Sequence, residues 1–212
     1  MQAPERDDLE REIRHRCASG DLTGAASVAI RRYGPEIFGF LLALHRSEAD
    51  AREVFSIFTE RVWRGLERFA WECSFRTWAY TIARNASLTY RVEERRRTKR
   101  ETSLPDGSEL YDVAEQVRTQ TLSFLKTSAK NRMAELRDTL PEDDRVLLSL
   151  RIDKVLSWND LARVMHGDDD RLSDEALRKE SARLRKRFQY VKERLLEMAR
   201  RDGVLDRTRK RP

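Results

Sequence analysis

The chain has 212 residues, and its 43 Lys and Arg against 37 Asp and Glu give a formal net charge of +6. Charged residues make up 38% of the sequence, and no segment approaches the roughly 18–20 uncharged apolar residues that cross a bilayer. The start of the chain also lacks the basic-then-apolar pattern of a secretory signal. We therefore expect a cytoplasmic protein without membrane insertion.

The sequence carries no motif of a familiar catalytic or metal site. Cys17 and Cys73 lie outside any CxxC spacing and the three histidines are scattered, so neither a disulfide framework nor a zinc site is expected. P-loop, GxGxxG, GxSxG and HExxH patterns are absent. The carboxylates alternate with basic residues at helical spacing, which is typical of solvated helix faces. We predict no catalytic residue, no metal and no cofactor, and hence a protein that is not an enzyme.

Apolar residues recur at spacings of three and four along most of the chain, which predicts an all-α protein. Asp21 and Ser47 are predicted N-caps, and Pro35 suits the first turn of a helix running to Leu44. From Ala51 an apolar stripe predicts one broad buried helix face. Its members are Val54, Phe55, Phe58, Val62, Trp63 and Leu66.

A break at residues 71–74 precedes a second long helix, which ends in the basic run Arg95–Arg100. We expect Phe75, Trp78 and Ile82 on its inward face, followed by either Ala86 or Leu88. The turn-forming residues 103–108 mark a boundary. Another amphipathic helix is predicted over residues 117–140, ended by Pro141.

The last third contains three predicted helices, Glu142–Leu150, Ser157–Met165 and Ser173–Arg200. Residues 167–172 form a turn between the second and third. Either Ser157 or Asn159 caps the second helix, and Ser173 caps the third. A helix, a turn and a basic helix in this order predict a helix-turn-helix.

Basic residues concentrate on the last of these helices. Residues 178–194 hold eight Lys or Arg against two Glu, and Lys179, Arg183 and Lys186 share one face. A solvated surface helix is one interpretation of this charge. The preceding helix and turn favour the other, a recognition helix presented to the major groove of DNA.

Aromatic and basic residues alternate around the break at 71–74, a pattern that suits unpaired nucleotides. A ring stacked on an exposed base contributes about 1–3 kcal/mol, and guanidinium groups hold the backbone. We expect Trp78 in the core and regard Trp71, Tyr80 and the loop as the better candidates for contact with DNA. The full set is Trp71, Phe75, Trp78, Tyr80 and Tyr90 with Arg76, Arg84 and Arg91.

The string Ser74–Asn85, SFRTWAYTIARN, resembles region 2 of the extracytoplasmic-function (ECF) sigma factors of the sigma-70 family. Asp50–Phe55 and Arg61–Phe69 stand where that family has its polymerase-binding helix. Leu140–Arg151 and Leu156–Ala162 resemble the start of region 4. The resemblance implies two small helical domains, a region 2 bundle and a region 4 helix-turn-helix, joined by a linker with a long helix.

The implied domains are residues 1–98 for region 2, 99–130 for the linker, 131–200 for region 4 and 201–212 for a basic tail. The resemblance implies a factor that directs core RNA polymerase to promoters, opens the minus-ten element with region 2 and reads the minus-thirty-five element with region 4. Core RNA polymerase, promoter DNA and a possible anti-sigma factor are the implied partners.

The same resemblance assigns three groups of residues. The minus-ten group is Trp71, Glu72, Cys73, Ser74, Arg76, Tyr80, Arg84, Asn85 and Arg91, with an extruded base held by the loop 71–74. The minus-thirty-five group is Arg178, Lys179, Glu180, Ser181, Arg183 and Lys186, with Leu177 anchoring the helix. The polymerase group is Val54, Phe55, Glu60, Arg61 and Arg64, of which Val54 and Phe55 have a place in the core as their alternative.

Three features depart from the family pattern. Ser56-Ile57 replaces the usual Gln and acidic residue, the turn 167–173 is long and acidic, and Lys179-Glu180-Ser181 replaces the usual Ser-Arg-Leu. The first departure leaves a different class of protein open, either a helix-turn-helix regulator acting without polymerase or a region 2 module that binds only other proteins. Binding to core polymerase distinguishes these readings.

Overall fold

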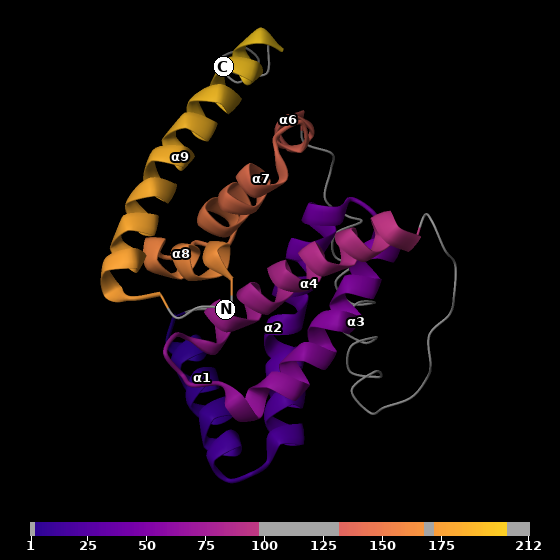
Figure 1. The fold of residues 1–212 in the computed structure, drawn as a ribbon, viewed down its shortest axis with the longest axis vertical. Coiled ribbons are helices and arrows are strands. Elements are labelled where there is room, and N and C mark those ends of the chain that lie inside the picture. The colour runs from indigo at the N-terminus through magenta and orange to yellow at the C-terminus, as the bar shows by residue number, and fades with distance from the viewer. Residues whose placement is uncertain (1–2, 98–131, 168–171, 203–212) are drawn as a thin grey trace, which may run out of the picture. The chain divides into compact units, whose positions relative to one another are not determined.

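The computed structural model describes residues 3–97, 132–167 and 172–202, which form helices and the turns between them, with no strand among them (Figure 1). The predicted all-α fold is confirmed. The chain divides into two compact units, residues 1–125 and 126–212. This division falls inside the predicted linker, and the finer boundaries at 98 and 130 stay predictions. Most of the helix predicted over 117–140 lies outside the described residues. None of the described helices has the length and low charge that crossing a bilayer requires.

The first unit is a bundle around a central helix. Its helices are α1 (Ala3–Ala18), α2 (Leu22–His45), α3 (Glu48–Gly65), the short 3-10 turn η1 (Leu66–Arg68) and α4 (Phe75–Arg97). α2 packs against α1, α3 and α4 (Figure 1). Its buried aromatic residues meet those of its neighbours, with Phe38 edge-on to Phe55 and Phe40 edge-on to Tyr80. The core therefore joins α2 to both α3 and α4.

Both predicted N-caps of the first unit are confirmed. The Asp21 carboxylate accepts a hydrogen bond from the Gly24 amide at 2.9 Å, and Ser47 Oγ accepts one from the Asp50 amide at 3.2 Å. The prediction that Pro35 begins a helix is wrong, because Pro35 lies inside the continuous helix α2. Buried residues on both sides of it hold the helix together, which offsets the roughly 3 kcal/mol cost of an interior proline.

Aromatic stacking joins the end of α3 to α4. The Trp78 ring is buried, as predicted, and stacks on Phe69 with centroids 4.5 Å apart. Gly65 permits this approach, because a Cβ there would lie 3.0 Å from the Trp78 ring. Further along α4, Ala86 is buried and Leu88 is exposed. Of the two residues predicted as alternatives for the inward face, Ala86 is therefore the one that faces the core.

The second unit contains α6 (Arg132–Asp138), α7 (Glu142–Leu148), the π-helical turn η2 (Ser149–Asp153), α8 (Trp158–His166) and α9 (Asp174–Arg201). α6 ends at Asp138, and Pro141 occupies the N-cap position of α7. Ser157 Oγ accepts from the Asp160 amide and Ser173 Oγ from the Ala176 amide, so Ser157 rather than Asn159 caps α8. The predicted order of helices in this unit is confirmed.

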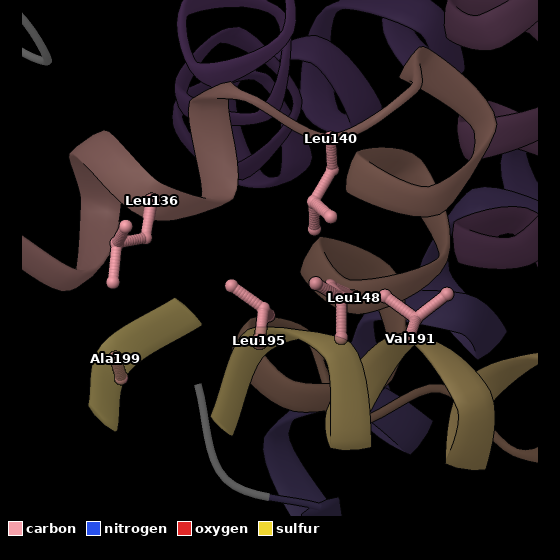
Figure 2. Packing of buried hydrophobic residues seen from close by; sticks show 6 residues of the cluster. All are labelled: Leu136, Leu140, Leu148, Val191, Leu195 and Ala199. Atoms are coloured by element: carbon pink, nitrogen blue, oxygen red, sulfur yellow. The ribbon is translucent and has the colours of Figure 1, made fainter. Parts of the chain in front are cut away.

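A hydrophobic cluster holds the C-terminal half of α9 against α6 and α7. Figure 2 shows the α9 side chains lying toward Leu136 of α6, Leu148 of α7 and Leu140 in the turn between these two helices. Phe188 and Met198 pack on the same cluster. Its members on α9 are Val191, Leu195 and Ala199.

Candidate nucleic-acid interface

The loop 70–74 between η1 and α4 lies at the surface of the first unit. Glu72 and Ser74 are exposed, and Trp71 and Cys73 are half-buried. Trp71 has a left-handed backbone with φ of 58°, which is uncommon for a residue with a bulky side chain. Its ring lies 4.7 Å from that of Phe69, and the Arg14 guanidinium lies over it at 5.5 Å. The loop is thus accessible and held by contacts from two sides.

The first turn of α4 is capped from within the unit. Ser74 Oγ accepts a hydrogen bond from the Thr77 amide at 3.0 Å. The Glu10 carboxylate of α1 accepts from the Phe75 amide at 2.6 Å and from the Arg76 amide at 3.0 Å. These bonds satisfy the three amides that a helix leaves unpaired ahead of Trp78, whose amide donates to the Ser74 carbonyl. Ser74, predicted to meet DNA, uses its hydroxyl as the helix cap.

Tyr80 is part of the core, so the prediction that its ring faces DNA is wrong. Its side chain is 0% exposed, and its hydroxyl donates to Glu36 of α2 at 2.8 Å. Burial and the neighbouring carboxylate raise the pKa of Tyr80, which keeps the hydroxyl protonated as a donor. Arg76 donates to the same carboxylate, and its side chain is only 12% exposed. The alternation of aromatic and basic residues in the sequence did not show that Tyr80 and Arg76 belong to a buried network and not to the surface.

The remaining minus-ten candidates lie further along α4. Arg84, Asn85 and Arg91 are half-buried. Arg91 donates to the Leu44 carbonyl at 3.1 Å, which ties α4 to the end of α2. Arg84 and Asn85 retain partial exposure and stay candidates for contact with DNA.

The polymerase group divides between core and surface. Val54 and Phe55 are fully buried, so their alternative reading as core residues is confirmed. Arg61 donates to Thr89 of α4 at 3.1 Å, while the exposed Glu60 and Arg64 form an ion pair at 2.7 Å.

Trp63 was predicted to be buried, but it is 46% exposed. It follows Val62 in sequence and therefore lies about 100° around the helix from that core position, beyond the edge of the buried stripe. This spacing was the signal that could have identified it as a surface residue. Trp63 and Arg64 border an open hollow of about 500 Å³ that is also lined by Gly20–Thr23 and Glu67.

The N-terminal half of α9 presents cations on its outer face. Arg178, Lys179, Arg183 and Lys186 are exposed. Lys179 pairs with Glu175 at 2.7 Å, and Arg183 pairs with the half-buried Glu180 at 3.2 Å. These exposed pairs are weak and leave the cations available to a polyanion. Leu177 is buried, as expected of the residue that anchors this helix.

Ser181 was predicted to face bases or phosphates, and that prediction is wrong. It is 2% exposed, and its hydroxyl lies 3.2 Å from the Trp158 carbonyl and 3.0 Å from Asn159 Oδ1. Ser181 therefore joins α9 to the start of α8. On the helix it lies on the same side as Leu177 and Leu184, which are also buried.

Two arginines outside the predicted minus-thirty-five group, Arg151 and Arg185, lie against the ring of Trp158. The guanidinium of Arg151 lies 4.7 Å from the Trp158 ring centroid and that of Arg185 lies 5.8 Å away. By contrast, Arg187 faces inward and donates to the buried Asp144 of α7 at 2.6 Å. The basic run on α9 therefore serves two purposes, since some of its members face solvent and Arg187 holds the fold.

The two cysteines form no disulfide with each other. Burial raises the pKa of the Cys17 thiol, which lowers its reactivity. Among residues 3–97, 132–167 and 172–202, no three His, Cys, Asp or Glu side chains gather as metal ligands would.

Comparison with known proteins supports a role in transcription. The family described as Sigma-70 region 2 matches residues 29–97. An ECF RNA polymerase sigma-E factor of Haemophilus influenzae is 30% identical over 144 residues, which cover 66% of this chain and 76% of the relative. An RNA polymerase sigma-H factor of Pseudomonas aeruginosa is 24% identical over 161 residues, which cover 74% of this chain and 83% of the relative.

Proposed function

Because the chain belongs to the ECF sigma factors of the sigma-70 family, we propose that its first unit opens the minus-ten element and its second unit reads the minus-thirty-five element. As a member of this family it is a transcription initiation factor that directs core RNA polymerase to promoters, and not an enzyme. Its partners are core RNA polymerase and promoter DNA. The cytoplasmic location and the anti-sigma factor stay predictions.

The observation that carries the minus-ten proposal is the half-exposed Trp71 ring in a surface loop fixed at both ends. Opening one base step costs a few kcal/mol, and stacking an unpaired base on an aromatic ring returns about 1–3 kcal/mol. Trp71, Glu72 and Cys73 form the proposed base-binding loop, with Arg84 and Asn85 following on α4.

The minus-thirty-five proposal depends on the exposed cations of α9. Arg178, Lys179, Arg183 and Lys186 are proposed to contact bases and phosphates of the duplex. The α8–α9 pair supports this arrangement, since Ser181 and Leu177 fix α9 against α8 and leave the basic face outward.

For the polymerase contact we propose the outer face of α3. Glu60, Trp63 and Arg64 are exposed there, and Arg61 lies at its edge. Ser56 and Ile57, at the family's usual Gln and acidic positions, are half-buried, and Ser56 donates to the Arg52 carbonyl. Glu60 lies one helical turn beyond Ser56, so the proposed contact surface is next to the position that departs from the family pattern.

The primary test is run-off transcription by core polymerase and the full chain on a library of genomic fragments. Selective transcripts are expected, and promoters recovered in this way supply the probes for the following tests. Chain that binds duplex DNA but does not co-elute with core polymerase would instead support a regulator acting without polymerase.

Two matched tryptophan variants separate the proposed surfaces. Trp71→Ala is expected to keep co-elution with core polymerase and to lose permanganate reactivity at the minus-ten element, while Trp71→Phe, which retains a ring, restores most of it. Trp63→Ala is expected to show the opposite pattern, with weakened co-elution. Normal melting by Trp71→Ala would contradict the proposed role of the loop.

A further inference from the structure

We propose that Glu10 of α1 is a positioning residue for the base-binding loop, acting through the first turn of α4. This inference rests on the proposed minus-ten function and deepens it. Glu10 is half-buried, and its carboxylate accepts hydrogen bonds from the Phe75 and Arg76 amides of α4. We infer that these bonds, together with the Ser74 cap, fix the point where the loop ends and the helix begins.

The contacts of Glu10 converge on one carboxylate from three sides. The Phe75 and Arg76 amides donate to its two oxygens at 2.6 and 3.0 Å, and the Tyr33 hydroxyl of α2 donates to it at 2.8 Å. Burial, together with the charge of Glu10, raises the pKa of Tyr33, so the hydroxyl stays a donor. A carboxylate at a helix N-terminus also interacts favourably with the helix dipole. Glu10 is therefore bound to α2 and α4 at the same time.

The loop that ends at this turn has a conformation that needs support. Trp71 has a positive φ, and backbones of that kind persist where surrounding contacts fix them. α1 provides two such contacts one helical turn apart, Glu10 at the C-terminal end of the loop and Arg14 over the Trp71 ring. A single helix therefore holds both the ring and the end of the loop.

Glu10 also determines which part of a nucleotide the loop can bind. A helix N-terminus with open amides is a ready phosphate site. Here Glu10 and the Ser74 hydroxyl already occupy the first-turn amides, so a DNA phosphate finds no open donor among them. The group that the loop presents to a nucleotide is therefore the Trp71 ring. Because the loop is already held in place, it loses less conformational entropy when a base binds.

α1 lies outside residues 29–97, the part of the chain that the region 2 family matches. The contacts of Glu10 thus extend the proposed minus-ten site to a segment that the match does not include.

The test measures base preference with complete holoenzyme. Core polymerase and full-length chain are mixed with single-stranded oligonucleotides that carry the non-template minus-ten sequence of a recovered promoter. Each base in turn is replaced by an abasic site, and the ratio of the two Kd values gives the preference for that base. Glu10→Ala is expected to lower the largest ratio about tenfold, the effect of losing a hydrogen bond to a charged group.

Three variants control the comparison. Glu10→Gln keeps one carbonyl acceptor and is expected to give an intermediate ratio. Glu12→Ala removes an exposed carboxylate from the same helix, where it pairs with Arg16, and is expected to leave the ratio unchanged. Arg14→Ala removes the cation over Trp71 and is expected to lower the ratio without altering co-elution with core polymerase.

The outcomes separate this inference from the proposed function. A wild-type holoenzyme with no base preference would overturn both. A wild-type preference that Glu10→Ala retains would overturn only the role of Glu10. If Glu10→Ala fails to co-elute with core polymerase, Glu10→Gln decides, and a wild-type ratio in that variant rejects the inference.

Discussion

Replacing Tyr80 by Phe tests the correction that the structure makes at this position. The change removes only the hydroxyl, which donates to Glu36 at 2.8 Å, and leaves the buried ring in place. A hydrogen bond to a charged group contributes about 1.5–3 kcal/mol. Glu36 keeps Arg76 as a partner and its side chain is 25% exposed, so water can replace part of the lost bond. We expect the free energy of unfolding to fall by about 1–2 kcal/mol.

The assay must report on the first unit alone. In a Trp158→Phe background the remaining tryptophans, Trp63, Trp71 and Trp78, all lie in that unit, and urea unfolding is followed by their fluorescence. Tyr190→Phe changes an exposed tyrosine of α9 and is expected to leave the transition unchanged.

The contribution of the Tyr80 hydroxyl to stability depends on pH in a predictable direction. The pKa of Tyr80 is raised in the folded state, so its contribution is complete below the ordinary tyrosine pKa of about 10 and is lost as the pH rises above it. The difference between wild type and Tyr80→Phe should therefore shrink above that pH. Unchanged stability at neutral pH, together with a specific loss of promoter melting, would refute the core role and return Tyr80 to the DNA surface.

Three further changes probe the rest of the molecule. Leu148→Ala is expected to lower the free energy of unfolding of the second unit by about 2–5 kcal/mol in urea titrations, because Leu148 is buried. Ile152→Ala, at an exposed position, should have little effect. Equal losses in the two variants would contradict the assigned core. Lys179→Ala with Arg183→Ala should lower the slope of log affinity for promoter duplex against log salt by about two, and an unchanged slope would place the DNA elsewhere. The pKa of Asp21 is lowered, first by the hydrogen bond from the Gly24 amide and then by Arg16. We therefore expect Asp21→Asn to be less stable than wild type in thermal melts above about pH 4, and the difference to disappear as the pH falls below that value. A difference in stability that persists at low pH would contradict this.

Local signals identified the helices and most of their starts. Asp21, Ser47, Ser157 and Ser173 cap the helices that their positions predict, because a capping side chain bonds to an amide three residues away. Such contacts depend on sequence spacing alone. Pro35 shows the limit of this reasoning, because tertiary packing on both sides of it continues α2 where local preference predicts a break.

The functional surfaces were harder to predict, since exposure depends on partners distant in sequence. Tyr80 is buried because Glu36, 44 residues earlier, accepts its hydrogen bond. Ser181 is buried because α8 supplies the Trp158 carbonyl, 23 residues earlier. Neither partner is visible from local periodicity. The cap that Glu10 provides to α4 spans 65 residues and no motif signals it.

α9 is a single helix of 28 residues, about 42 Å long at 1.5 Å per residue. Its front end carries the exposed cations, and its rear end is clamped by the cluster in Figure 2, with the Arg187–Asp144 bond between them. The front half of α9 is also fixed, because Leu177 is buried and the Ser181 hydroxyl bonds to the Trp158 carbonyl of α8, so the helix is held at two separate places. If the proposed DNA contact of α9 is right, the angle at which the cations meet a duplex depends on both attachments, and a substitution at Leu195 would alter that angle without touching a nucleotide.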